Sequence, residues 1–277
     1  MVTTMGIANP GTVHVTKWDG RRRDAPTVVL VHGILAWGTD SLYGFGAQQP
    51  LSGRYRLLVM DRRGYGASPD TTRSDYETDA DDIVALLGDG AHLVGHSYGG
   101  VAAMVAAARN PQAVHSLTLI QPGCLQVAAD EPVVARTLKA NREGLARLPA
   151  ALSPAAYLQL ATESVGLPPL AATEARLRAA ATTMGERPCW QGQLPVEELR
   201  EAPWPKLVIS GTWEDAPEAY RRLAGEALMA CARVTAERIG GELLQVPGYY
   251  PQVQHPDIVN DALDRFWSRA DGERTRY

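Results

Sequence analysis

The chain has 277 residues, a formal net charge of −4 and a pI near 5.9, so no basic surface of the kind that binds nucleic acid is expected. Hydrophobic residues make up 45% of the chain, which is enough for one large α/β domain with an inserted sub-domain. The only basic cluster is a run of three arginines at positions 21–23, which we interpret as a solvated loop before a strand.

The cysteines Cys124, Cys189 and Cys231 are widely spaced and form no CxxC motif. This pattern argues against a zinc site or a disulfide framework, so no metal is expected. The start of the chain has neither the charged nor the apolar segment of a signal peptide, and no apolar stretch approaches the roughly 20 residues that span a bilayer. We therefore expect a cytoplasmic protein without a membrane partner.

Several short runs have the composition of β-strands. The first alternates apolar and polar residues like an edge strand, whereas the second is a continuous aliphatic run typical of a strand buried on both faces. In chain order the predicted strands are 13–18, 27–31, 56–60, 91–94, 116–120, 206–210 and 242–246. Helical patterns lie between most of them, at 79–87, 101–109, 219–239 and 256–268. This alternation predicts an α/β fold with a mostly parallel, doubly wound sheet covered on both faces.

One interval breaks the alternation. Between Ile120 and Lys206 the sequence contains helical runs interrupted by prolines and no convincing strand. Because a loop of that length is uncommon inside a compact domain, we predict an insertion of three or four short helices. The predicted organisation is an α/β core of residues 1–123 and 204–277 with a helical cap of residues 124–203. An insertion at the carboxyl ends of the strands would cover that edge as a lid.

The most informative motif is G-x-S-x-G at residues 95–99, centred on Ser97. It follows the predicted strand 91–94 and precedes an Ala-rich run that predicts a helix. A serine on such a turn is held at the top of a parallel sheet with its hydroxyl exposed. Gly95 and Gly99 leave room for the cramped turn, where a side chain would collide with the neighbouring backbone. The pattern indicates a nucleophilic serine.

With these segments identified, the chain resembles the α/β-hydrolase family of serine-nucleophile enzymes with a helical cap. The segments that carry the resemblance follow the family's order and spacing; they are Val31-His32-Gly33, residues 61–68 (DRRGYGAS), residues 95–100 (GHSYGG) and residues 210–214 (SGTWE). The resemblance covers nearly the whole core but does not inform the cap. It implies a cofactor-free enzyme with a small-molecule substrate.

The resemblance implies that Ser97 is the nucleophile, which needs a base because a serine hydroxyl is a weak nucleophile at neutral pH. The oxyanion hole would use the backbone N–H groups of Ile34 and Tyr98. Such donors are typically worth about 10²–10³ in rate each. His32 and His96 flank these positions, where the family uses the residues for packing or for orienting loops.

The acid of the triad is expected after the strand at 206–210, three residues past a strand-ending glycine. Counting from Gly211 leads to Glu214, and a proline follows three residues later, as in the family. Asp215 is the immediate neighbour and the more usual residue type. We take Glu214 as the candidate acid, with Asp215 as the alternative. A solvated carboxylate at a helix start is a further interpretation of both.

The catalytic histidine is where the chain departs from the family pattern. The family places it within Pro-Gly-x-x-His-x-Pro, just past the last strand, whereas residues 246–256 read VPGYYPQVQHP. Aligning the next proline puts Tyr249 at the usual position of the base, with two residues of loop lost. His255 follows six residues later. Two interpretations stay open: either His255 folds back to act as the base, or Ser97 has no imidazole partner.

These features support two functional hypotheses. The first is a serine hydrolase that uses Ser97, Glu214 and His255 on a small ester, lactone or related carbonyl compound, with Trp37 and Tyr249 lining the substrate pocket. The second is a hydrolase fold without hydrolase chemistry, acting as a non-hydrolytic cyclase, lyase or isomerase, or as a ligand-binding protein. The sequence identifies neither the substrate nor the oligomeric state.

Overall fold

Seven strands form one sheet in the order β1-β3-β2-β4-β5-β6-β7 in a computed structural model that describes residues 12–19, 24–149 and 151–274. The strands are β1 Val15–Trp18, β2 Thr27–Val31, β3 Arg56–Met60, β4 Ala91–His96, β5 Val114–Ile120, β6 Lys206–Gly211 and β7 Glu242–Val246. Only the pairing of β1 with β3 is antiparallel. The predicted α/β fold with a mostly parallel sheet is therefore confirmed. The arginine run at 21–23 and the start of the chain lie outside the described residues.

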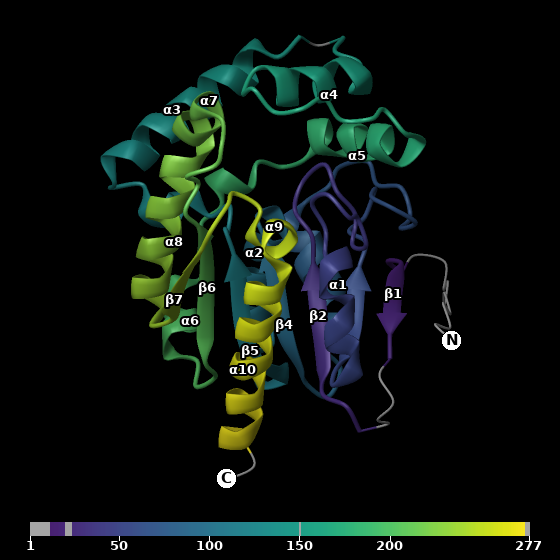
Figure 1. Cartoon of the computed structure of the whole chain (residues 1–277), viewed down its shortest axis with the longest axis vertical. Helices are drawn as coiled ribbons and strands as arrows, with labels where there is room; N and C mark the ends of the chain where they lie inside the picture. Colours follow the sequence, from purple (N-terminus) through teal and green to yellow (C-terminus); the bar gives the residue numbers. More distant parts are fainter. Residues whose placement is uncertain (1–11, 20–23, 150, 275–277) are drawn as a thin grey trace.

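Helices cover both faces of the sheet (Figure 1). One face carries α1 Tyr76–Leu87, α2 Tyr98–Arg109 and α8 Glu226–Ile239, and the other carries α10 Pro256–Arg274 and the short 3-10 helix η1 Gly46–Gly53. Each of the four predicted helices is present, but α1 begins at Tyr76 and not at Asp79. The reason is the cap: the Asp75 side chain accepts a hydrogen bond from the Glu77 N–H at 3.0 Å.

The helix predicted at 219–239 is interrupted near its start. A π-helical turn, Arg221–Gly225, lies between α7 Glu218–Tyr220 and α8. A Cβ on Gly225 would lie only 2.5 Å from the Trp213 ring, so the glycine allows this wider turn to pack directly against the tryptophan. The interruption therefore depends on a contact with the loop after β6, which periodicity does not reveal.

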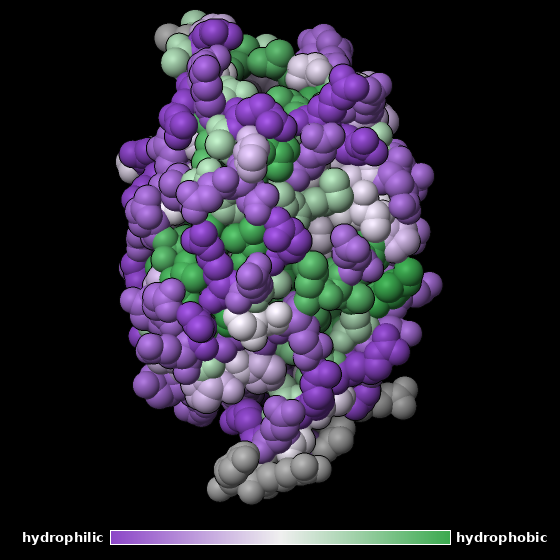
Figure 2. Space-filling view, turned by 90° about the vertical axis from the view of Figure 1, so that its left-hand side faces the viewer, coloured by the Kyte–Doolittle hydropathy of each residue, from purple (hydrophilic) through white to green (hydrophobic). Residues whose placement is uncertain are grey.

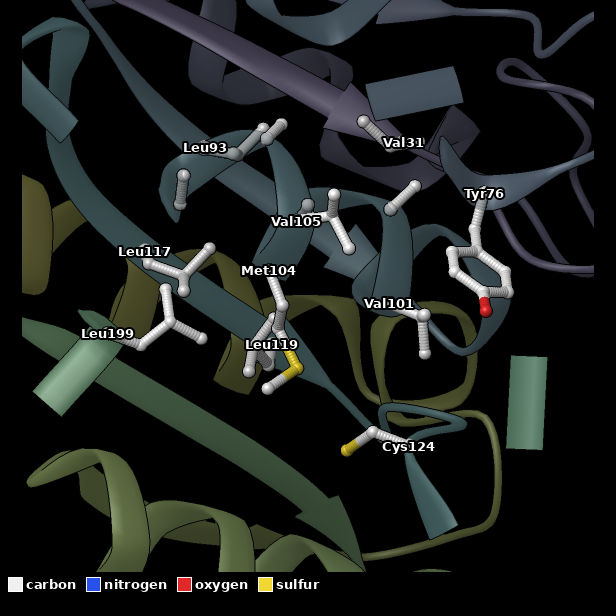
Figure 3. Close-up of a cluster of buried hydrophobic side chains, with 14 of the residues drawn as sticks. Val31, Tyr76, Leu93, Val101, Met104, Val105, Leu117, Leu119, Cys124 and Leu199 are labelled. Atoms are coloured by element: carbon white, nitrogen blue, oxygen red, sulfur yellow. The ribbon is translucent and has the colours of Figure 1, made fainter. Parts of the chain in front are cut away.

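The central strands are buried on both faces because successive side chains of a strand point to opposite sides of the sheet. In β2, Val28 and Leu30 belong to the hydrophobic cluster under α10, and Val29 and Val31 belong to the cluster under α1, α2 and α8. Figure 3 shows the second cluster, where side chains of α2 meet those of β4 and β5. The continuous apolar run in β2 thus contributes side chains to both hydrophobic clusters.

Between β5 and β6 the described residues form four α-helices and no strand. These helices are α3 Pro132–Arg147, α4 Pro154–Glu163, α5 Glu174–Gly185 and α6 Val196–Glu201. In Figure 1, α4 and α5 lie above the carboxyl ends of the strands, and α3 packs against α8. By contrast, α6 packs against α2 and α8, on the face of the sheet that these two helices cover. The division into a core and a cap at residues 124 and 203 stays a prediction.

The side of the molecule that carries α3 and α8 has a mixed surface, with hydrophobic side chains lying between hydrophilic ones (Figure 2). Exposed apolar residues of these neighbouring elements are Leu145 of α3, Leu223 of the π-helical turn and Leu243 of the edge strand β7. In the described part of the chain, no helix combines the length and the apolar character that crossing a bilayer requires.

Candidate active site

Ser97 lies on the turn between β4 and α2, at the carboxyl edge of the sheet. Its φ is +53°, a left-handed conformation that is uncommon for a residue other than glycine and is found at functional turns. A Cβ on Gly95 would lie 2.4 Å from Gly99 O, and a Cβ on Gly99 would lie 2.3 Å from a carbonyl of β2. Backbone hydrogen bonds of 3.0 Å run from Ser97 N–H to Ile120 O and from Gly123 N–H to Ser97 O. The serine is therefore held rigidly by its neighbours.

Two backbone donors flank this turn. The N–H groups of Ile34 and Tyr98 make no hydrogen bond to any described residue. Tyr98 is the first residue of α2, and the first N–H groups of a helix have no partner inside it. The carbonyl of Gly33 accepts hydrogen bonds from His32 Nδ1–H at 2.8 Å and from the Arg62 guanidinium at 3.1 Å. Because the Gly33–Ile34 peptide is trans, the Ile34 N–H points away from that carbonyl.

A buried ion-pair network supports the Gly33 carbonyl. The fully buried Arg62 side chain lies 2.9 Å from Asp79 Oδ2 and 2.7 Å from Glu186 Oε1. Its guanidinium carbon also lies 4.1 Å from the centroid of the Tyr98 ring, a cation–π contact. Burial raises the pKa of Asp79 to about 6 and also raises that of Glu186. Glu186 directly follows α5, so the network links the serine turn to the inserted helices.

Two buried histidines lie beside the serine. Burial lowers the pKa of His96 to about 4, and burial together with the Arg62 charge lowers that of His32 to about 3, so both rings are neutral at pH 7. His32 uses both ring nitrogens in hydrogen bonds, whereas His96 Nδ1 is buried without a partner among the described residues. A Cβ on Gly33 would lie 3.0 Å from Ser97 Cβ and 3.2 Å from His96 Nδ1, which places all three residues together.

Both candidate acids lie on the turn after β6 and are exposed to solvent. Neither Glu214 nor Asp215 makes a hydrogen bond or an ion pair with any residue that the structure describes. The buried residue of this turn is Trp213, whose φ is +58° and whose Nε1–H donates to Gln121 Oε1 at 2.7 Å. Neither carboxylate orients an imidazole in this arrangement.

Aromatic side chains occupy the region where the family pattern has histidine. The Tyr249 ring packs against Trp213 and Tyr220, at 5.9 Å between ring centroids in each case. The Tyr250 ring lies 6.0 Å from the His96 ring, and its hydroxyl is 3.0 Å from the Tyr220 hydroxyl. Burial raises the pKa of Tyr250 well above its usual value. Tyr220, Tyr249 and Tyr250, referred to below as the tyrosine cluster, thus place three phenol side chains in this region.

His255 lies at the junction of α9 Pro251–Gln254 and α10. Its backbone N–H donates to Pro251 O at 3.0 Å, and its carbonyl accepts from the Val259 N–H at 3.2 Å, so its backbone belongs to both helices. Its imidazole is half-buried and makes no hydrogen bond to a described residue, and the same is true of Ser97 Oγ. No hydrogen bond therefore joins Ser97, His255 and Glu214, and the roles of the last two stay predictions.

Gln121 is a residue of this region that the sequence analysis did not identify. It follows β5, has a φ of +43° and is buried. Its Oε1 accepts hydrogen bonds from the Gly211 N–H at 3.0 Å and from Trp213 Nε1–H, while its Nε2 donates to Tyr249 O at 2.8 Å. One amide thus ties the loops after β6 and β7 to the end of β5. No local signal could have found it, since its partners lie 90 to 128 residues later.

Trp37 lies on the loop after β2, where α5 packs against it. The guanidinium carbon of Arg176 is 4.7 Å from the centroid of the Trp37 ring. The same guanidinium makes a buried, two-point ion pair with Asp40 at 2.8 and 2.9 Å. A further link runs from the Leu35 N–H to Thr183 Oγ1 at 3.1 Å. These contacts dock α5 on the loop after β2, and a role for Trp37 in lining a pocket stays a prediction.

No group of three metal-ligating side chains gathers around Ser97 within the described residues. Among all described residues, the one such group consists of His92, His115 and Asp271, which lie near the starts of β4 and β5 and near the end of α10. It therefore lies at the opposite edge of the sheet from the serine (Figure 1).

Comparison with known proteins places this geometry in context. The model of the alpha/beta hydrolase family matches residues 28–262. A pimeloyl-[acyl-carrier protein] methyl ester esterase of Aeromonas salmonicida is 36% identical over 108 residues, which are 38% of this chain and 41% of that protein. The protein of the same name from Methylococcus capsulatus is 38% identical over 95 residues, 34% of this chain and 36% of its own. The match thus spans about two fifths of these relatives.

Solved structures resemble the chain over nearly its whole length. A carboxylesterase from Bacillus subtilis has a TM-score of 0.62 at 19% identity, covering 95% of this chain and 90% of its own. A structure from a study of carboxylesterases of Nitrososphaera gargenis has a TM-score of 0.67 at 17% identity, covering 97% of this chain and 100% of its own. At these identities the likeness shows the fold alone.

Proposed function

Because the chain belongs to the alpha/beta hydrolase family, whose model matches residues 28–262, we propose that it is a serine hydrolase of a small ester, lactone or related carbonyl compound. The observation that carries the proposal is the turn at Ser97, where a serine at positive φ is flanked by the Ile34 and Tyr98 N–H groups, which have no acceptor among the described residues. The names of the relatives, which are ester hydrolases, support an ester as substrate.

In the proposed reaction, Ser97 Oγ attacks the carbonyl carbon of the ester while its proton passes to a base. The carbonyl oxygen becomes an oxyanion that accepts hydrogen bonds from the Ile34 and Tyr98 N–H groups, each worth about 10²–10³ in rate. The alcohol then leaves with the proton from the base, and an acyl ester remains on the serine. Water cleaves this ester through the same steps and regenerates the free hydroxyl.

The proposed base is His255, and the proposed acid that orients it is Glu214. Since His255 makes no hydrogen bond to Ser97, the segment between β7 and α10 has to fold toward the serine when substrate binds. The six residues from Tyr249 to His255 span up to about 20 Å when fully extended, so the movement requires the short helix α9 to unwind. Catalytic hydrogen bonds are often long without substrate and tighten in the complex.

The test is labelling with a fluorophosphonate probe between about pH 6 and pH 9, together with turnover of an activated aryl ester. We expect the wild-type protein to be labelled at Ser97 and the Ser97→Ala variant to be neither labelled nor active. The His255→Ala variant should lose about 10²–10⁴ in kcat/KM, whereas Asp257→Ala, an exposed position on α10, should lose little. A wild-type protein that is not labelled anywhere in this range contradicts the proposal.

A second candidate is a repurposed fold that performs a non-hydrolytic reaction or binds a ligand. The observation that favours it is the tyrosine cluster, which offers phenol hydroxyls as hydrogen-bond donors in the place of a base. In that case the Ser97→Ala variant keeps ligand binding and most activity, while Tyr249→Ala and Trp37→Ala damage both. Equal loss of turnover in the Ser97→Ala and His255→Ala variants rules this candidate out.

A further inference from the structure

At the amino edge of the sheet, His92, His115 and Asp271 come together from three elements. One ligand atom of each residue lies within 4.8 Å of the ligand atoms of the other two. His92 Nε2 is 3.3 Å from Asp271 Oδ1, which is an ion-pair distance when the histidine is protonated. His92 Nε2 and His115 Nδ1 are both buried nitrogens without a hydrogen-bond partner among the described residues. Such orphaned buried groups are uncommon in proteins and call for a physical explanation.

The backbone is shaped to bring His115 to this position. Ala91 pairs with Val114 and His92 pairs with Ser116, so His115 is an extra residue in β5, as in a β-bulge. Bulges re-aim side chains and are rare between parallel strands. Without the bulge, His115 would point to the opposite face of the sheet from Ser116.

A glycine makes room for the His115 ring. Gly90, just before β4, has a φ of +140°, and a Cβ on it would lie 2.1 Å from His115 Nε2. Any other residue at position 90 would therefore displace the imidazole. The bulge in β5 and the glycine before β4 are separate features, and both direct the His115 imidazole toward His92.

His92 is held in place on its other sides. Its Nδ1 lies 2.8 Å from Ser116 Oγ, and the Trp267 ring of α10 stacks on its imidazole at 5.7 Å between centroids. When the His92 Nδ1–H donates to the serine hydroxyl, the lone pair of Nε2 faces Asp271. Metal-bound histidines are commonly oriented in this way by a hydrogen bond from the second ring nitrogen.

The distances suit a small divalent ion. Two ligands that bind Zn²⁺ at about 2.0–2.1 Å in a tetrahedron are about 3.3 Å apart, which is the separation of His92 Nε2 and Asp271 Oδ1. The ligand atom of His115 lies within 4.8 Å of the other two, so side-chain shifts of up to about 1.5 Å bring it to the same separation of about 3.3 Å. One nearby cation among the described residues is Arg274, whose charge opposes metal binding and is balanced by the Asp271 carboxylate.

We propose that His92, His115 and Asp271 bind a divalent transition-metal ion, Zn²⁺ above all, that fastens the last helix to the amino edge of the sheet. Two imidazoles and one carboxylate, with water as the fourth ligand, are a set that binds zinc in enzymes. Because the site lies at the opposite edge from Ser97, its role is structural, and it is independent of the proposed hydrolase reaction. Zn²⁺ links β4, β5 and α10 only in the folded chain, so it stabilises the fold by mass action.

The test uses the full-length protein, freed of metal with EDTA and dialysed, and titrated with Zn²⁺ in a calorimeter. We expect one Zn²⁺ per chain and a rise in Tm of about 5 °C when free Zn²⁺ exceeds the Kd a hundredfold. Co²⁺ in place of Zn²⁺ should give the visible d–d absorption of a four-coordinate site. The His115→Asn and Asp271→Asn variants should each bind Zn²⁺ at least about 10-fold more weakly.

The matched control is Asp261→Asn, an exposed aspartate on the same helix, which should bind Zn²⁺ as the wild type does. Asp271 is partly exposed, so its variant folds even if the His115 variant does not. Equal binding by the wild type and both site variants overturns the proposal, because the ion is then bound elsewhere. Absence of binding up to millimolar Zn²⁺ overturns it as well. Labelling of Ser97 by the fluorophosphonate probe is read separately, so the two proposals fail independently.

Discussion

His96 combines complete burial with an unpartnered ring nitrogen beside Ser97. A charged imidazole in this position would have to give up its hydration without gaining an acceptor, so burial holds its pKa near 4. The Tyr250 ring covers it from the side of the loop after β7. At this scale the imidazole beside the serine is neutral and has no carboxylate partner among the described residues, in contrast to the charged carboxylate–imidazole pair of a complete triad.

The neutrality of His96 has a consequence for the pH dependence of stability. The folded pKa of about 4 lies below the ordinary value of 6.5, so the stability present above pH 6.5 is lost as the pH falls toward 4. At about pH 5 this single group reduces the free energy of unfolding by about 2 kcal/mol. The His96→Gln variant has no such titration. In urea denaturation, the free energy of unfolding of the wild type minus that of the variant should therefore fall by about 2 kcal/mol between pH 7 and pH 5. A difference that stays constant between these pH values would contradict this prediction.

The strand–turn–helix element at residues 91–109 is tightly constrained by its neighbours. Glycines at positions 95 and 99 allow β4, α2 and the loop after β2 to approach within contact distance of one another. The Ala-rich face of α2 is fully buried, because Ala102, Ala103 and Ala106 let the helix lie close to the sheet. The same element therefore determines both the position of the serine and the packing of the core.

A matched pair of glycine substitutions tests this constraint. The Gly95→Ala variant places a Cβ 2.4 Å from Gly99 O, so we expect it to lower the free energy of unfolding by about 1–3 kcal/mol or more and to reduce probe labelling of Ser97. Gly144 lies in α3 with no atom within 4 Å of an added Cβ, so Gly144→Ala should raise stability by about 0.5–1 kcal/mol. Chemical denaturation measures both, and equal effects would show that crowding at the turn is not the cause.

At the scale of the whole molecule, the inserted helices are joined to the sheet by buried charges. Arg176 of α5 pairs with Asp40 on the loop after β2, and Glu186 pairs with Arg62 on the loop after β3. These arginines are 4% and 0% exposed, so neither pair is screened by solvent. The geometry of the serine site is thus coupled to the docking of α5.

Removing one partner of a buried pair leaves an uncompensated charge, which typically costs about 3–5 kcal/mol. We expect the Arg176→Gln variant to lose stability by this amount and to be cleaved faster within residues 124–203 in limited proteolysis. Arg147→Gln in α3 removes an exposed ion pair with Glu143 and should cost less than about 1 kcal/mol. Similar losses for the two variants would contradict a role for the buried pair in docking α5.

Local patterns predicted the strands well because each is a short run rich in aliphatic residues, and they predicted the ends of the helices less well because caps and tertiary contacts decide them. Because the Asp75 side chain caps the helix, α1 begins at Tyr76 and not at the predicted Asp79. The π-helical turn is accompanied by the contact of Gly225 with Trp213. The candidate nucleophile and its backbone donors could be predicted because they depend on a turn of a few residues. The surroundings of the candidate base could not, since the loop after β7 departs from the family pattern.

By itself, the sequence determined the succession of strands and helices, the position of Ser97 on its turn and the departure at Tyr249, because each depends on neighbouring residues. Only the tertiary structure decided that Glu214 is exposed, that the tyrosine cluster stands beside His96, and that Gln121 joins two loops. The physical reason is separation along the chain. Arg176 and Asp40 are 136 residues apart, and such partners meet only when the loops fold over the edge of the sheet.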